Sequence, residues 1–182
     1  MSDGENQKGT VGRSGFSGDA YPLRPFVSAD TMALRELFAQ SIDELTQDDY
    51  TEDQRLAWVA LAVDIDAFAA RLGKQLTLIV QVDGEYLGFA TLKDNTFVDM
   101  LYVHPHHAGL GVGTALADAL EKIATSRGSL ELTVEASDTA VPFFESRSYI
   151  ATSRNLLAID DEWLSNTTMK KTLGAVSTKI EA

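Results

Sequence analysis

Apolar residues recur at intervals of three and four in two stretches of the chain, and this spacing predicts two amphipathic helices. The first stretch follows Ser28-Ala29-Asp30, a polar segment typical of a helix start, and its apolar positions are Met32, Leu34, Leu37, Phe38 and Ile42. The second ends at Arg127, before a capping Gly128, and its stripe consists of Leu116, Leu120, Ile123 and Ala124. Two shorter helices are predicted, one from Thr51, which has capping-box spacing to Gln54, and one over residues 65–72.

Alternating or continuous apolar runs predict the strands. Residues 76–82 and 85–92 form a hairpin around Asp83-Gly84, which is a strong signal for a two-residue turn. Residues 97–103 are apolar at both parities, as is typical of an interior strand. Residues 130–135 alternate, a short helix is expected over residues 141–146, and residues 149–159 and 166–173 are expected to form a closing hairpin.

This order of elements predicts an α/β (α+β) fold, in which a mixed, mostly antiparallel central sheet has helices on both faces. The strand-helix-strand unit over residues 97–135 should be parallel and right-handed. We expect one domain over residues 21–182. Residues 1–20 are rich in glycine, serine and polar residues without periodicity, so they predict a disordered N-terminal tail.

A glycine-rich turn joins the interior strand to the second long helix. His104-Pro105 ends the strand, and Gly109, Gly111 and Gly113 follow at alternate positions. Backbone N–H groups at the start of a helix suit a phosphate or pyrophosphate. The turn lacks the Gly-Lys-Ser/Thr ending of a P-loop, and its G-x-G-x-G order differs from the G-x-G-x-x-G dinucleotide fingerprint. The alternative is a strand-to-helix turn that binds no ligand.

The segment LYVHPHHAGLGVGTAL, residues 101–116, resembles the cofactor-binding segment of the GNAT acetyltransferase superfamily, which carries Gln/Arg-x-x-Gly-x-Gly/Ala after a bulged central strand. LTVEAS (132–137), PFFESRSY (142–149) and NTTMKKTL (166–173) resemble later family segments, so the resemblance covers roughly residues 21–173. It implies a V-shaped splay between the strands that end at Val103 and Glu135. Three positions depart from the family pattern: Ala108 replaces Gln/Arg, Phe144 replaces a tyrosine, and Ser148 replaces a glycine.

The resemblance implies acetyl-CoA as co-substrate, with its pantetheine arm on the backbone of the central strand and its pyrophosphate on the amides of the glycine turn. The implied cofactor-binding residues are Leu101, Tyr102, Val103, Ala108, Gly109, Leu110, Gly111, Val112, Gly113, Thr114, Ser137 and Phe144. Ala108 removes a side-chain contact but keeps its amide. Thr114 either adds a hydroxyl to a phosphate or only caps the helix.

Acetylation of an amine requires a neutral nitrogen, so a general base is expected. Asp99 is the first candidate, because it shares strand parity with Leu101 and Val103 and should project into an apolar row, where burial raises the pKa of a carboxyl. The alternative is a structural carboxylate. Glu135, at the end of the facing strand, is the second candidate. Phe144 stands where the family's tyrosine is thought to protonate the departing thiolate, and phenylalanine cannot do so.

Other residues have less specific interpretations. His104, His106 and His107 invite a metal site, but no carboxylate cluster lies near them in the sequence, so we expect exposed loop histidines and no metal. Trp58, Phe38 and Tyr50 are interpreted as core, with an acceptor pocket as the alternative. The acidic set Asp48, Asp49, Glu52 and Asp53 is interpreted as a solvated face.

Composition narrows the function classes. The chain has 182 residues and no cysteine, which excludes disulfides, thiolate zinc sites and a cysteine nucleophile. Its net charge of -12 argues against nucleic-acid binding and favours a cationic acceptor such as an amine. No signal peptide and no apolar run long enough for a bilayer are present, so no membrane association and a cytoplasmic location are expected.

The GNAT resemblance implies an N-acetyltransferase that moves an acetyl group from acetyl-CoA to a primary amine by direct attack, with a backbone amide holding the oxyanion. The acceptor is a small molecule or a peptide, and its identity stays open. A homodimer is possible. The alternative is a degenerate, non-catalytic module that binds acyl-CoA as a sensor or partner-binding protein.

Overall fold

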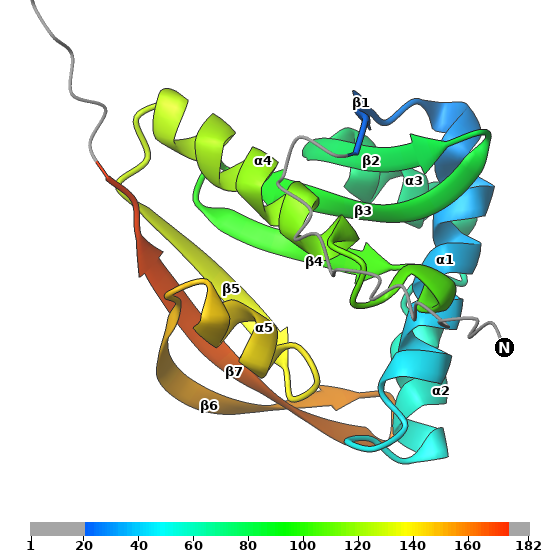
Figure 1. The fold of residues 1–182 in the computed structure, drawn as a ribbon. Helices are drawn as coiled ribbons and strands as arrows, with labels where there is room; N and C mark the ends of the chain where they lie inside the picture. Colours follow the sequence, from blue (N-terminus) through cyan, green and yellow to red (C-terminus); the bar gives the residue numbers. More distant parts are fainter. Residues whose placement is uncertain (1–20, 175–182) are drawn as a thin grey trace, which may run out of the picture.

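A seven-stranded sheet organises the protein, in the order β1-β2-β3-β4-β5-β7-β6 (Figure 1). The computed structural model describes residues 21–174, and the predicted tail, residues 1–20, lies outside them together with residues 175–182. Every neighbouring pair is antiparallel except β4 and β5, which confirms the mixed, mostly antiparallel sheet. The strands are β1 (Leu23–Pro25), β2 (Leu76–Val82), β3 (Glu85–Lys93), β4 (Phe97–Val103), β5 (Glu131–Ser137), β6 (Ile150–Ile159) and β7 (Glu162–Thr172).

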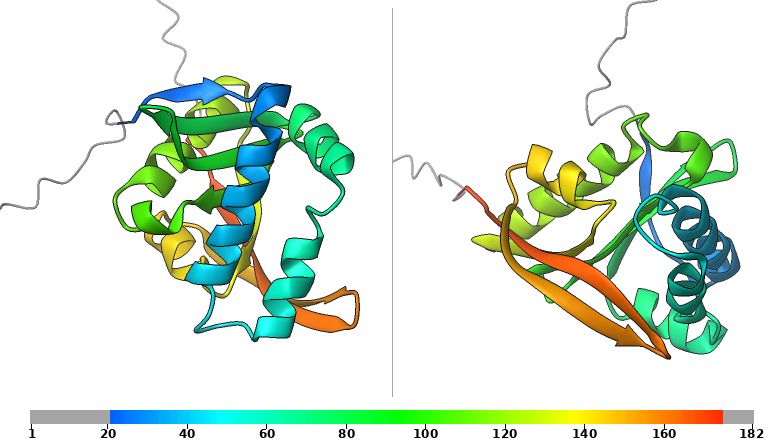
Figure 2. Two further views of the ribbon diagram at one scale, coloured as in Figure 1. Left: turned by 90° about the vertical axis from the view of Figure 1, so that its right-hand side faces the viewer. Right: turned by 90° about the horizontal axis from the view of Figure 1, so that it is seen from below.

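Helices cover both faces of this sheet, and each face has its own hydrophobic core (Figure 2). One face carries α1 (Thr31–Leu45), α2 (Glu52–Ala60) and α3 (Ile65–Gly73), after a short 3-10 turn, η2 (Ser28–Asp30). The other face carries α4 (Val112–Ser126) and α5 (Val141–Ser146). A second 3-10 turn, η3 (Pro105–His107), leads from β4 towards α4. Within residues 21–174, no helix combines the length and the apolar character that crossing a membrane would require.

Local sequence signals account for several of these elements. Asp83 and Gly84 both have positive φ, 51° and 86°, as the predicted two-residue hairpin turn requires. The capping box before α2 is formed: the backbone N–H of Gln54 donates to Thr51 Oγ1 at 3.3 Å, and Gln54 Oε1 accepts the Thr51 N–H at 2.9 Å. The closing hairpin is tighter than predicted, because Asp160 adopts positive φ and β7 begins at Glu162 rather than at Asn166.

A β-bulge at Asp99 breaks the regular alternation predicted for β4. Thr91 of β3 pairs with Met100, but the next residue, Leu92, pairs with Val98, so Asp99 has no partner across the ladder. Val98 and Leu101 therefore pack on the α4 side, whereas Met100 packs on the side of α1 and α3. The expectation that all residues of one parity share a face is wrong on this strand.

The sheet splits between β4 and β5. Only Phe97↔Thr133 and Val98↔Val134 pair across this junction, and Figure 1 shows the two strands diverging beyond it. The predicted V-shaped splay is therefore confirmed. Tyr50 connects the two halves on the open side: its hydroxyl accepts the Asp138 N–H at 2.9 Å and donates to the Ser165 carbonyl at 2.7 Å. These bonds tie the loop between α1 and α2 to the ends of β5 and β7.

Candidate active site

The larger of two neighbouring cavities lies in the V between β4 and β5 and has a volume of about 560 Å³. Most of the predicted cofactor residues line it, together with both candidate bases, Asp99 and Glu135. Leu110 and Val112 are the exceptions. The side chain of Leu110 is exposed, and Val112 is fully buried in the core against β3. One continuous space therefore contacts the central strand, the glycine turn and the end of β5.

The glycine turn presents the start of α4 to this cavity. Gly109 and Gly111 have φ of 74° and 93°, values that L side chains rarely adopt, and Gly111 is the N-cap residue of α4. No side chain caps this end of the helix, so its first amides remain available to an anion. The Tyr21 hydroxyl donates to the Leu110 carbonyl at 2.8 Å, which fastens the turn from outside.

A second, smaller cavity of about 170 Å³ adjoins the first on the side of α1 and α2. The residues common to both linings are Trp58, Asp99, Met100, Tyr102, Glu135 and Ser137. Phe38 and Tyr50 line the smaller cavity too, so these aromatic residues serve both as core and as pocket wall. The acidic set Asp48, Asp49, Glu52 and Asp53 is exposed, as expected.

The Asp99 carboxylate accepts hydrogen bonds from two residues that lie far from it in the sequence, Arg71 and Gln75. Arg71 donates from Nε to Oδ2 and from Nη2 to Oδ1, both at 2.9 Å, and Gln75 Nε2 donates to Oδ2 at 2.7 Å. Burial favours the neutral acid, but these donors outweigh it and leave the pKa of Asp99 below its usual range. The expected rise of this pKa is wrong, because the bulge turns the carboxylate towards α3. This environment suits a structural carboxylate.

Glu135 is the other carboxylate at the junction of the two cavities. Its side chain is exposed, and within residues 21–174 it enters no ion pair and no side-chain hydrogen bond. An unpaired carboxylate that faces the meeting point of two cavities is available to accept a proton. Of the two carboxylates, Asp99 is engaged by Arg71 and Gln75, whereas Glu135 has no partner among residues 21–174.

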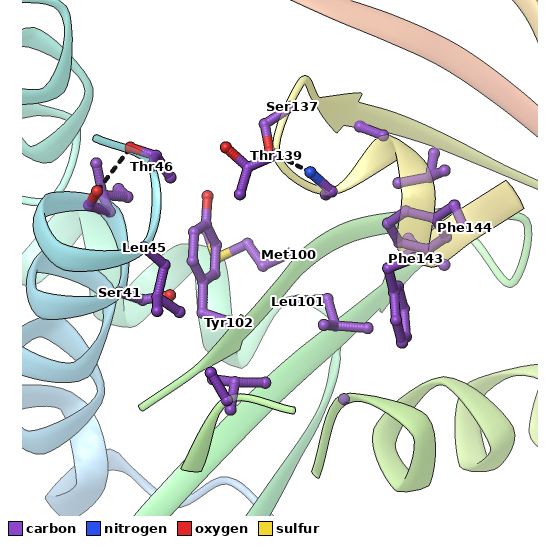
Figure 3. A pocket seen from close by; sticks show the side chains of 18 of the residues that line it. Ser41, Leu45, Thr46, Met100, Leu101, Tyr102, Ser137, Thr139, Phe143 and Phe144 are labelled. Atoms are coloured by element: carbon purple, nitrogen blue, oxygen red, sulfur yellow. Dashed lines mark hydrogen bonds between the residues drawn. The ribbon is translucent and has the colours of Figure 1, made fainter. Parts of the chain in front are cut away.

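Tyr102 directs its hydroxyl into the larger cavity, towards Ser137 and Thr139 (Figure 3). Its ring is packed against three aromatic neighbours, Phe38 at 4.7 Å, Phe89 at 5.7 Å and Trp58 at 6.4 Å between centroids. Burial raises the pKa of this phenol, so it keeps its proton at neutral pH and acts through hydrogen bonds rather than by giving the proton up. Sequence reasoning assigned Tyr102 a backbone role only.

Comparison with known proteins identifies the family. A family model described as an acetyltransferase (GNAT) domain matches residues 46–173. The chain belongs to the GNAT acetyltransferase family. The protein is therefore an acetyl-CoA-dependent acyltransferase, and the relatives described below are likewise named N-acetyltransferases.

Two relatives place this GNAT protein more closely. It is 52% identical to a GCN5-related N-acetyltransferase of known structure from Rhodopseudomonas palustris, with a TM-score of 0.83 over 84% of this chain and 96% of that one. It is 26% identical to the uncharacterized N-acetyltransferase YafP of Escherichia coli K12 over 81% of this chain and 93% of YafP. The PaiA N-acetyltransferase of Thermoplasma acidophilum, solved in complex with coenzyme A, shares the fold at 20% identity, with a TM-score of 0.66 over 84% of this chain and 99% of that one.

In this GNAT protein, Phe144 stands at the position of the family's tyrosine and packs in an aromatic cluster. Phe144 is buried and lines the larger cavity, with its ring 5.1 Å from Phe143 and 5.1 Å from Tyr149 between centroids. Tyr149 is buried behind it, with Lys171 Nζ 5.6 Å from its ring centroid, and does not line either cavity. The Tyr149 hydroxyl therefore has no place in the lining of either cavity.

The histidine turn of this GNAT protein has an acidic neighbour after all. Glu85, the first residue of β3, places Oε1 3.0 Å from His107 Nε2. This neighbour is distant in the sequence, and the antiparallel pairing of β3 with β4 brings the start of one strand to the end of the other. His106 is exposed, as expected, whereas His104 and His107 are half-buried, so the expectation of exposed histidines is wrong for these two.

Several residues that line the pocket were not predicted from the sequence to be part of a binding site. The wall facing Tyr102 comes from the inner face and C-terminal end of α1, and the far rim comes from the turn before α5 and from α5 itself (Figure 3). These residues are Ser41, Ile42, Leu45, Thr46, Thr139, Ala140 and Phe143. Their helical spacing in α1 predicts a core face, and only the long-range packing of α1 against β4 turns that face into a pocket wall.

Proposed function

We propose that this GNAT protein acetylates a primary amine by direct attack of the amine on the thioester of acetyl-CoA. Acetyl-CoA lies in the larger cavity, with its pyrophosphate on the amides at the start of α4 and its pantetheine arm along β4. The acceptor enters from the side of α1 and α2. PaiA was solved with coenzyme A and Salmonella typhimurium YncA with acetyl-CoA, and both share this fold, which supports acetyl-CoA as the co-substrate.

The observation that carries the proposal is the junction of the two cavities. In a direct-attack mechanism both substrates must be bound at the same time and in contact, because no covalent enzyme intermediate carries the acetyl group. Tyr102 and Glu135 line both cavities, so substrates in the two cavities would meet beside these residues. A module that only binds acyl-CoA needs no second opening at that point. The shared lining therefore favours the transferase over the non-catalytic alternative.

The chemistry balances with groups at this junction. A bond forms between the amine nitrogen and the carbonyl carbon, and the bond from that carbon to sulfur breaks. Glu135 accepts the proton that the nitrogen releases, directly or through a water molecule. The Tyr102 hydroxyl donates a hydrogen bond to the departing thiolate, which leaves as the anion and takes its proton from solvent. A thiolate leaves readily even without an acid, since a free thiol has a pKa near 8.5.

The smaller cavity favours a small acceptor with an apolar body. Its walls include Trp58, Tyr102 and Leu164, and its volume of about 170 Å³ admits a small molecule or one side chain rather than a folded surface. Arg71 compensates the charge of Asp99, so Glu135 supplies the net negative charge that attracts an ammonium group.

The test is release of free thiol from acetyl-CoA across a panel of small amines, amino acids and peptides. With the best acceptor, Glu135→Gln should lower kcat/KM by about 100- to 10,000-fold while coenzyme A affinity stays unchanged. Asp99→Asn is the matched control, and it should leave the acidic limb of the pH–rate profile in place. Thiol release from no amine, with coenzyme A still bound, would favour the non-catalytic alternative, and an equal loss in Asp99→Asn would reject the assignment of the base.

A further inference from the structure

Three side chains that the reaction does not use converge beside the glycine turn. Glu85 begins β3, His104 follows β4 directly, and His107 ends η3. Each can offer one ligand atom, and these atoms all lie within 4.8 Å of one another. The closest approach, between Glu85 Oε1 and His107 Nε2, is 3.0 Å. Two imidazoles and one carboxylate form a donor set that occurs in zinc sites.

The backbone holds these three residues in place. The His104 N–H donates to the Leu87 carbonyl at 2.9 Å, which extends the β3–β4 ladder to the histidine turn. Within the turn, the His107 N–H donates to the His104 carbonyl at 2.8 Å, and the two imidazole centroids are 5.7 Å apart. The side chains therefore project from a sheet end and a hydrogen-bonded turn, so a metal would need to order little more than the Glu85 side chain.

We propose that Glu85, His104 and His107 bind a divalent transition metal, with zinc as the preferred ion. Zinc accepts imidazole nitrogen and carboxylate oxygen at tetrahedral geometry, so three protein ligands leave a fourth position for water. The site is open to solvent, since the Glu85 side chain is 57% exposed and that of His107 is 24% exposed. The bound metal should therefore exchange with the medium rather than be trapped on folding.

Binding requires one local change at His104. Its Nδ1 now accepts the His106 N–H at 3.2 Å. Ligation through Nδ1 replaces this contact, and ligation through Nε2 requires a proton on Nδ1, so either geometry ends it. The contact is long for an N–H donor, and the His106 N–H lies in an exposed turn where water can replace the acceptor.

The metal would also affect the anion site next to it. His107 immediately precedes Ala108, which lines the larger cavity, and the turn continues to the N-cap of α4 at Gly111. A dication bridging Glu85 and His107 fixes the start of this turn against β3. It also adds positive charge close to a phosphate site in a chain of net charge -12. Zinc should therefore tighten binding of coenzyme A.

The small number of possible zinc ligands in the sequence simplifies a binding experiment. The chain has three histidines, all in this turn, and no cysteine, so no second imidazole or thiolate site competes. Calorimetric titration of zinc chloride into the full chain, in a buffer that does not chelate, should show one saturable site. His107→Ala and Glu85→Gln should each weaken it by at least about tenfold. Asp83→Asn, which removes a carboxylate from the neighbouring turn but not from the cluster, should change the affinity by less than about twofold.

His106→Ala provides the second control, because His106 lies in the same turn but outside the cluster. This variant should keep its zinc affinity, and thermal unfolding should confirm that all four variants fold as the wild type does. The absence of saturable binding, an affinity in His107→Ala equal to that of the wild type, or an equal loss in His106→Ala would each overturn the proposal. Titration of coenzyme A with and without zinc tests the coupling, which must disappear in His107→Ala.

Discussion

Gly88 of β3 should control coenzyme A affinity from behind the cofactor site. A Cβ atom at this position would lie 2.8 Å from Val112 Cγ1 and 2.9 Å from the Tyr102 carbonyl oxygen. Ordinary contacts begin at 3.4 Å, so β3 must separate from both neighbours by about half an ångström. The carbonyl belongs to the backbone of β4, and Val112 is β-branched and fully buried, so neither can rotate away.

Gly88→Ala should therefore destabilise the protein and weaken cofactor binding together. Overpacking of this kind costs about 1 to 3 kcal/mol, and about 2 kcal/mol corresponds to a fall in Tm of about 4 to 8 °C for a chain of this size. Val112 is the first residue of α4, so the strain should displace the amides on which we place the pyrophosphate. Loss of one such hydrogen bond, about 1.4 kcal/mol, weakens coenzyme A binding about tenfold.

Urea unfolding and calorimetry with coenzyme A measure the two effects. Gly73→Ala is the matched control, because no heavy atom lies within 4 Å of its added Cβ, and it should leave coenzyme A affinity unchanged. Adding Val112→Ala to Gly88→Ala removes the 2.8 Å contact and should restore part of the affinity. A Gly88→Ala protein with wild-type stability and affinity would refute the reasoning.

Three further predictions concern the cofactor turn, the acid response and the missing tyrosine. Gly111→Val places a β-branched residue at φ 93°, so coenzyme A binding measured by calorimetry should be lost while unfolding stays cooperative, and unchanged affinity would contradict it. Asp30 has a pKa of about 2, chiefly because of hydrogen bonds from Arg24, so it stabilises the fold above the ordinary pKa of 3.8 and loses this effect as the pH falls towards 2. Between pH 3.8 and pH 2 the unfolding free energy of the wild type should therefore fall by about 2 kcal/mol because of Asp30, and this part of the fall should be absent in Asp30→Asn. An equal fall in both proteins would contradict the assignment. Phe144→Tyr should raise kcat if departure of the thiolate limits the rate, and no gain would place the limit elsewhere.

Sequence patterns predicted the fold well where the signal is local. The hairpin at Asp83-Gly84 depends on two residues that tolerate positive φ, and the capping box at Thr51 depends on a spacing of three residues. The glycine turn was readable for the same reason, since Gly111 adopts the conformation that a side chain disfavours. Each of these signals lies within a few residues of the structure that it specifies.

The errors arose where residues distant in the sequence meet. The bulge at Asp99 is set by pairing with β3, and the carboxylate then binds Arg71, 28 positions away. Glu85 reaches His107 across 22 positions for a similar reason. Neither contact leaves a periodic trace in a single sequence, so the pKa of Asp99 and the surroundings of the histidines could not be predicted. These long-range contacts decide the chemistry more than the fold.

The splay between β4 and β5 also has a consequence for hydrogen exchange. The slowest amide protons of a sheet usually belong to its central strands, where both edges are paired. In this protein β4 is central, yet within the described chain its pairing with β5 stops at Val98, which leaves an unpaired backbone edge inside the sheet. The amides of β4 that face β5 should therefore exchange much faster than those that face β3. A ligand that lies along this edge completes the sheet as an added strand would, and its arrival should be visible as slowed exchange on one side of a single strand.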